Sequence, residues 1–92
     1  MTKTMTTIKP ADEFGAVLAG RTLAARMREQ VEAAAVESDV VIDFAGIEMM
    51  SPSFADELIA KLPRDLLGAG RIRIEHLSDE IASLARFVIA GR

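Results

Sequence analysis

One short run of residues constrains the fold of this chain more than any other feature. Residues 40–44 (VVIDF) contain three consecutive β-branched apolar side chains, followed by an aspartate and a phenylalanine. A continuous apolar run is typical of a strand buried on both faces, as in the centre of a parallel sheet. Parallel neighbours need long crossover connections, so the run predicts helices before and after it.

Apolar residues recur with helical spacing both before and after this strand. It extends from residue 21 to about residue 36, from residues 51–53 to about Leu62, and from Ser78 onward. Pro63 lacks an amide hydrogen and should end the second helix, with a short extra turn over residues 63–67. The apolar stripes predict the helical faces that pack on the sheet. They consist of Leu23, Met27, Val31 and Ala34 or Ala35 in the first helix, Phe54, Leu58 and Leu62 in the second, and Ile81, Leu84, Ala85, Val88 and Ile89 in the last.

Other segments predict additional strands. Residues 71–75 (RIRIE) alternate charged and apolar side chains, which favours a half-buried strand near an edge. The Thr-rich segment 1–9 is a weaker strand candidate, and the apolar patch over residues 14–18 is either a second short strand or a turn. We therefore expect an α/β fold, with residues 1–92 forming one domain whose mixed or mostly parallel sheet has about four strands and helices packed against it.

Composition excludes several functional classes. Half of the 92 residues are apolar and 27% are charged, as in a folded globular domain. The net charge is −3, with no basic run, no Trp and no Tyr, so nucleic acid is not an expected partner. The apolar runs are too short to span a bilayer and no signal peptide is recognisable, so we expect no membrane contact and a cytoplasmic location.

The residues that catalysis would require are scarce. The sequence has no cysteine and one histidine, His76, which excludes cysteine nucleophiles, cysteine-ligated zinc and two-histidine metal motifs. Asp56 and Glu57 are adjacent and would point about 100° apart on a helix. The glycines at 68 and 70 precede a strand and do not form a phosphate loop. We expect no enzymatic activity, no metal and no cofactor.

A motif in the middle of the chain resembles a known family. Residues 40–47 (VVIDFAGI), followed by residues 50–58 (MSPSFADEL), resemble the STAS-like domain of unknown function, which has a V-x-D-F-x-G-[VI] strand and an S-x-S-F-A-D-E-L helix start. Weaker similarity extends to residues 13–15, 20–21 and 85–88. The resemblance implies a small α/β domain related to the STAS domains of bacterial anti-sigma factor antagonists.

The wider relatives imply a partner and a mode of control. Such antagonists bind an anti-sigma factor that is a Ser/Thr kinase of the histidine-kinase-like ATPase type, and phosphorylation of one serine separates the pair. Aligned with their motif, Asp43 matches the first aspartate, Met50 the methionine and Ser53 the phosphorylated serine. The chain differs from that motif at Ser51, Pro52 and Phe54. The resemblance thus implies that Ser53 is a phosphoacceptor and that the partner is such an ATPase or anti-sigma factor.

The start of the second helix also has two readings that rest on its own chemistry. Ser53 with Asp56 fits a capping box, whereas Ser51 as the cap would place Pro52 at the first helical position, where proline is favoured. A cap alone contributes about 1 kcal/mol. The same helix start could instead hold an anion or a nucleotide phosphate, with Ser51, Ser53 and Asp43 as candidate site residues.

The surroundings of this helix start supply further candidates. Asp43 follows a buried strand and is expected to accept backbone N–H bonds from residues 45–47 or from the helix start. Arg21 begins a helix against the dipole, and a nearby carboxylate is its expected partner. One of the two methionines at 49 and 50 should be in the core and the other exposed. The candidate partner-binding residues are Glu48, Met49, Met50, Ser51, Phe54, Asp56 and Glu57.

Two functional hypotheses result. The first is a non-catalytic regulatory domain that switches partners under the control of Ser53. The alternative is a sensor that binds a small ligand or a nucleotide at Ser51–Ser53. The two differ in whether nucleotides alone stabilise the protein.

Overall fold

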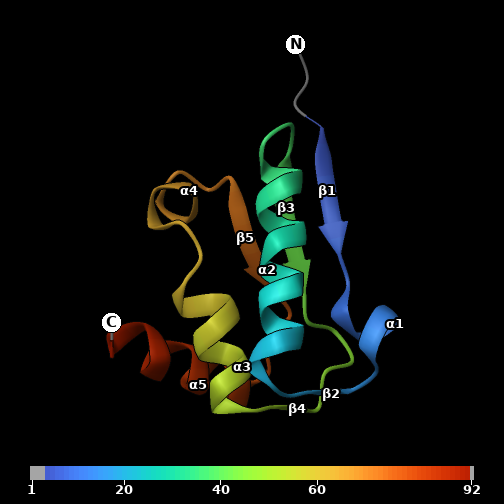
Figure 1. Ribbon diagram of the computed structural model, residues 1–92, viewed down its shortest axis with the longest axis vertical. Coiled ribbons are helices and arrows are strands. Elements are labelled where there is room, and N and C mark those ends of the chain that lie inside the picture. Colours follow the sequence, from blue (N-terminus) through green and yellow to red (C-terminus); the bar gives the residue numbers. More distant parts are fainter. Residues whose placement is uncertain (1–3, 92) are drawn as a thin grey trace.

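Helices and strands alternate along the chain in the computed structural model, which describes residues 4–91 (Figure 1). Three parallel strands form the main sheet, and helices pack on it. The elements, in order, are β1 (Met5–Ile8), α1 (Pro10–Phe14), β2 (Val17–Leu18), α2 (Arg21–Ala35), β3 (Asp39–Asp43), β4 (Met49–Met50), α3 (Pro52–Ala55), the π-helical turn η1 (Asp56–Ala60), α4 (Arg64–Gly68), β5 (Ile72–Glu75) and α5 (Asp79–Ala90).

The apolar run that dominates the sequence forms the centre of the main sheet. The strand order is β1-β3-β5, and both neighbours of β3 are parallel to it. Met5 lies opposite Asp39, and Val40 lies opposite Ile72. The predictions of a central parallel strand at 40–44 and of an outer strand at 71–75 are confirmed.

The remaining strands form a separate ribbon. Residues 4–91 form five strands in two sheets where the sequence predicted about four in one sheet, because within this range β2 pairs in parallel with β4 and not with the main sheet. The amide of Ser51 donates to the carbonyl of Leu18 at 2.8 Å, which holds the two segments together. The helix α1 was not predicted. It begins at Pro10, at a position in the first turn where proline is favoured, and thereby separates β2 from β1.

The hydrophobic core lies mainly on one face of the main sheet. Val40, Ile42 and Ile72 are at most 1% exposed and share this face with Met27 and Val31 of α2. On the opposite face Val41 is 5% exposed. There Arg73 reaches across from β5 to the Sδ atom of Met5, at 3.6 Å. Side chains of the neighbouring strands therefore complete the burial that the sequence predicted for both faces of β3.

The second helical segment connects the helices of the core layer. The turn η1 contacts both α2 and α5, and α3 contacts the same two helices. Pro63 follows this segment and precedes α4, as predicted. In Figure 1 the start of α3, the ribbon β2–β4 and the start of α2 lie at the end of the molecule toward which the strands of the main sheet point. This end carries the candidate site.

Candidate functional site

The helix α3 begins with a serine cap followed by a proline. Ser51 has an extended backbone conformation, and its Oγ accepts the amide of Phe54 at 3.1 Å. Pro52 occupies the first turn. The sequence allowed either Ser51 or Ser53 as the N-cap, and in the structure the N-cap is Ser51. The capping box from Ser53 to Asp56 is wrong, because Ser53 is already within the helix.

Ser53 is half-buried beside this cap. Its Oγ lies 3.2 Å from the Oγ of Ser51. The Ser51 hydroxyl also lies 3.4 Å from the amide nitrogen of Gly20, which donates to it. Because a hydroxyl oxygen has two acceptor sites, and both then receive backbone N–H groups, we expect Ser51 to donate its proton to Ser53. The hydroxyl hydrogen of Ser53 is then available to another group.

Few backbone amides remain at this helix start to bind an anion. Pro52 has no N–H, Phe54 donates to the side chain of Ser51, and Ala55 donates to the Ser51 carbonyl at 3.0 Å. At most the amide of Ser53 is left in the first turn. An anion site depends on several converging N–H groups. The geometry therefore favours the anion-binding hypothesis less than the sequence did.

The π-helical turn after α3 is held by an ion cluster. Arg28 Nη1 lies 2.7 Å from Glu57 Oε2 and 2.6 Å from the Glu57 carbonyl oxygen. Lys61 Nζ lies 2.9 Å from Glu57 Oε1, and Arg21 approaches the same oxygen at 3.4 Å. Lys61 and Arg28 lower the pKa of the Glu57 carboxyl to about 2. Glu57 thus connects α2 to η1 as a carboxylate.

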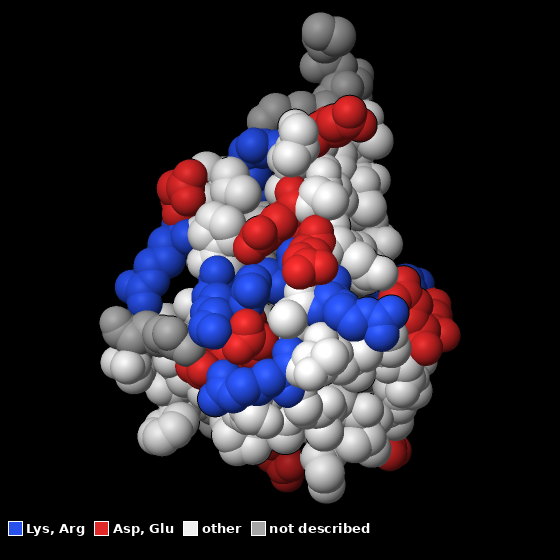
Figure 2. Space-filling view, viewed as in Figure 1, with Lys and Arg blue, Asp and Glu red and all other residues white. Residues whose placement is uncertain are grey.

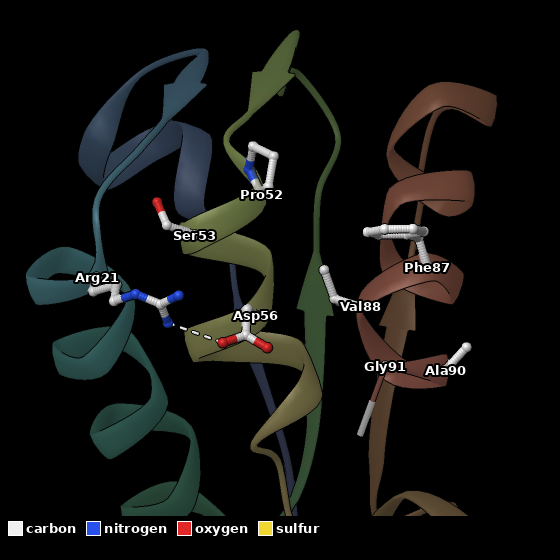
Figure 3. A pocket seen from close by; sticks show the side chains of 8 residues that line it. All are labelled: Arg21, Pro52, Ser53, Asp56, Phe87, Val88, Ala90 and Gly91. Atoms are coloured by element: carbon white, nitrogen blue, oxygen red, sulfur yellow. Dashed lines mark hydrogen bonds and ion pairs between the residues drawn. The ribbon is translucent and has the colours of Figure 1, made fainter.

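Arg21 joins this cluster to the start of α3. Its Nη1 lies 2.9 Å from Asp56 Oδ2. Hydrogen bonding to Asp56 raises the pKa of the Arg21 guanidinium above its usual value. The expectation that a nearby carboxylate pairs with Arg21 is confirmed, and the pair spans the space between α2 and η1 (Figure 3).

An open groove lies between α3 and the C-terminal half of α5. Its volume is about 720 Å³. Pro52 stands on one side and Phe87 on the other, the Arg21–Asp56 pair lies one helical turn further along from Ser53, and the Ser53 side chain points away from Phe87 (Figure 3). Phe87 is 74% exposed, an unusual position for an aromatic side chain. The complete lining is Arg21, Pro52, Ser53, Asp56, Phe87, Val88, Ala90 and Gly91.

The structure separates the predicted partner-binding residues into two groups. Glu48 and Met49 are exposed, and Ser51 and Asp56 are half-buried at the surface. Met50, Phe54 and Glu57 are buried, and so their side chains are not available to a partner. Including these three was wrong, because Phe54 and Met50 fill the core and Glu57 binds the cations around it. The prediction of one buried and one exposed methionine is confirmed.

Asp43 forms a separate structural site. Its Oδ1 accepts the amide of Ala45 at 2.9 Å and lies 2.7 Å from Nδ1 of His76. These two contacts lower the pKa of the Asp43 carboxyl. The expected backbone bond to residues 45–47 is confirmed. Of the three candidate anion-site residues, Ser51 and Ser53 contact each other, whereas Asp43 contacts Ala45 and His76.

The sequence interpretation missed Phe87, Arg28 and Lys61. One signal was present for Phe87, which lies off the apolar stripe of an otherwise regular helix. Within residues 4–91, no cluster of three or more His, Asp or Glu side chains could hold a metal ion. In the same part of the chain, no helix has both the length and the apolar character needed to cross a membrane.

Comparison with known proteins gave one informative result. Residues 20–82, more than half of the chain, match a family described as a STAS-like domain of unknown function. The match begins at the residue that precedes α2 and extends into α5, so it includes the start of α3 and the ion cluster. Comparisons with curated proteins and with solved structures gave no match.

Proposed function

This chain belongs to the family of STAS-like domains of unknown function, and we propose that it is a regulatory domain that binds a protein partner around the start of α3 and releases it when Ser53 is phosphorylated. In this proposal the domain catalyses no reaction and acts in the cytoplasm, where ATP is available to a kinase. The proposal extends the regulatory role that the family suggests to a named surface and a named residue.

One observation carries the proposal. Ser53 lines one side of an open groove whose other side carries the exposed ring of Phe87, and its hydroxyl group lies at the margin of that groove, pointing away from Phe87 (Figure 3). Exposed aromatic and apolar side chains around a concave surface are typical of protein-binding sites. A modification of Ser53 would alter the margin of that surface. We include Glu48 and Met49 in the proposed binding surface because both are exposed and closely precede the start of α3.

The charges around Ser53 indicate whether phosphorylation would strengthen or weaken partner binding. A phosphoserine carries a charge of about −1.5 to −2 at neutral pH. It would lie near Asp56, one helical turn further along, and would compete with that carboxylate for Arg21. A doubly charged group at the margin of this groove must also remain hydrated when a partner approaches, which disfavours docking. We therefore expect phosphorylation to weaken binding.

The resemblance to anti-sigma factor antagonists supports the choice of partner. It favours an ATPase of the histidine-kinase-like class that acts as an anti-sigma factor. In the proposed reaction the Ser53 Oγ atom attacks the γ-phosphorus of ATP, ADP leaves, and the hydroxyl proton passes to a base of the kinase. Phe54 does not obstruct this approach, because its side chain is 0% exposed and points into the core.

Affinity capture from a lysate of the source organism tests the proposal. The baits are the wild type, Ser53→Glu and Ser53→Ala, with Gln30→Glu as the matched control, since Gln30 is exposed on α2 and is not a groove residue. We expect the wild type, Ser53→Ala and Gln30→Glu to retain an ATPase that Ser53→Glu loses. The captured ATPase should transfer labelled phosphate from ATP to the wild type and not to Ser53→Ala.

Two results would reject the proposal. Equal retention of the same ATPase by wild type and Ser53→Glu would make Ser53 a structural residue. A large rise in melting temperature with ATP or ADP alone would favour the ligand-sensor alternative, because a ligand that binds the folded state stabilises it by mass action.

A further inference from the structure

The outer edge of β1 carries unpaired backbone groups. Among the described residues, β1 pairs with β3 and with no other strand. The amide of Asp39 donates to the carbonyl of Thr4, so the parallel register directs the backbone groups of Thr4, Thr6 and Ile8 toward β3. The N–H and C=O groups of Met5 and Thr7 therefore point outward, and they offer about four hydrogen bonds to an additional strand.

The strand β1 is four residues long and is followed by Lys9 and Pro10, but within the strand itself two of the usual protections of an edge are missing. The sequence of β1 (MTTI) has no charged residue and no proline. The other outer strand, β5, contains Arg73 and Glu75 and contacts α4. In Figure 2 the flank occupied by β1 shows little charge, whereas charged groups crowd the middle of the same face. The β5 edge of the sheet thus carries charged side chains, and the β1 edge does not.

A hollow lies beside this edge on the face that carries the helices. It has a volume of about 260 Å³ and lies between β1 and the C-terminal half of α2. Small side chains of α2, Ala33 and Ala34, form one wall, and Thr4 and Thr6 of β1 form the other. Glu37 is the charged residue of the lining and is exposed. The Thr6 and Ser38 hydroxyl groups, which belong to two residues of the lining, lie 2.7 Å apart.

These two features are adjacent and suit one kind of ligand. A strand added to β1 would place alternate side chains on the helical face, about 5 Å from those of Thr4 and Thr6. Those side chains would enter the hollow. Backbone pairing at an edge combined with a side-chain pocket beside a helix is a general mode of peptide recognition.

We propose that the edge of β1 and the hollow beside α2 receive an extended segment of a partner protein, which adds a strand to the main sheet and directs a lysine or arginine side chain toward Glu37. This surface is distinct from the groove at Ser53, and the inference does not depend on the proposed function. The charge of Glu37 is the reason for the basic side chain.

A second copy of the chain suits the site less well. In a symmetric antiparallel pair, Met5 would lie opposite Thr7 of the other copy, and Thr6 would lie opposite Thr6. Residues of β1 would then supply the side chains in the hollow, and none of them is a cation. Self-association would leave Glu37 without a partner from the added strand.

A random-peptide display library, selected on the full chain, provides the test. Peptides enriched on the wild type should bind Thr7→Pro about tenfold more weakly or worse, because proline removes an outward N–H and its ring blocks the edge. Thr7→Val is the matched control, since it keeps the N–H group. In the wild type the bound peptides should shift the NMR signals of the Met5 and Thr7 amides.

The Glu37→Lys variant makes the test independent of how well Thr7→Pro folds. Glu37 is exposed, so the substitution should preserve the fold. Selection on the wild type should enrich one basic position, and selection on Glu37→Lys should enrich an acidic residue there. The proposal is overturned if enriched peptides show no charge preference at any position, if they shift signals around Pro52 and Phe87 instead, or if the wild type is a dimer that Thr7→Pro dissociates.

Discussion

Two helices of this protein begin with the same cap, yet their surroundings differ. In α3 the amide of Phe54 donates to Ser51 Oγ at 3.1 Å, and in α5 the amide of Ile81 donates to Ser78 Oγ at 3.2 Å. In both, the third residue after the serine is a buried apolar side chain. The local geometry of the two helix starts is therefore almost identical.

The difference lies in the residues between cap and core. The first turn of α5 contains Asp79 and Glu80, whose charges favour the positive end of the helix dipole. The first turn of α3 contains no acidic residue; Pro52 and Ser53 stand there instead. At the start of α5, the serine cap and two acidic residues satisfy both the backbone amides and the helix dipole. At the start of α3, no acidic residue of the first turn offsets the dipole, and the hydroxyl group of Ser53 lies beside a groove. This contrast is why we propose a function for the start of α3 and not for the start of α5.

The largest expected effect comes from the apolar residue that each cap holds in place. Phe54→Ala should lower the free energy of unfolding by about 3–5 kcal/mol and Ile81→Ala by about 2–3 kcal/mol, because the phenylalanine leaves the larger cavity. A small domain has about 5–10 kcal/mol in total, so Phe54→Ala should be close to unfolding. Denaturant titration followed by far-UV circular dichroism measures both. An equal or larger loss for Ile81→Ala would contradict the stronger anchoring of α3.

A smaller difference is expected at the caps themselves. Ser51→Ala should cost about 1–2 kcal/mol and Ser78→Ala about 0.5–1 kcal/mol, because Ser51 accepts the amides of both Phe54 and Gly20 whereas Ser78 accepts that of Ile81. The same denaturant titration applies. Ser51→Asn, which can still cap the helix, is the control and should recover most of the loss. Equal costs for the two alanine variants would show that the bond from Gly20 contributes nothing.

The sequence predicted one of these helix starts better than the other. At α5 a single serine precedes a regular apolar stripe, so the cap and the boundary were both predicted correctly. At α3 two serines flank a proline, and each gave a plausible cap. The proximity of Gly20, which comes from a distant part of the chain, supports Ser51 and could not be inferred from local sequence.

The chemical surroundings of the candidate site were harder to predict than its position. Residues 40–47 and 50–58 indicated the helix start where the candidate site lies, but Glu57 was assigned to the partner-binding surface and is buried. Its burial depends on Arg28 and Lys61 and on the π-helical turn that places its carboxylate between them. A turn with one extra residue changes which side chains share a face, so helical periodicity cannot predict that arrangement.

The smallest expected effect concerns acid. The folded-state pKa of Glu57 is about 2, below its ordinary value of 4.5, so its ionised form stabilises the fold at neutral pH. That contribution should be complete above about pH 5 and should decline as the pH falls toward about 2. Its size is reduced because the surrounding ion pairs are partly exposed and screened by solvent. Denaturant titrations at pH 7, 5 and 3 should show this loss of stability for the wild type.

Two variants separate this effect from that of the other carboxylate with a lowered pKa. Glu57→Gln should reduce the acid-dependent loss, whereas Asp43→Asn should remove a different part of it, because Asp43 bonds to Ala45 and His76 away from the cluster.

Amide hydrogen exchange then locates the change. In the wild type at pH 3, protection should fall over Asp56–Ala60 more than over Asp79–Ala90, since the cluster holds the former and a serine cap holds the latter. Equal loss of protection in both segments would mean that the two segments respond to acid as one unit, and that the ion cluster does not distinguish the segment after α3 from α5.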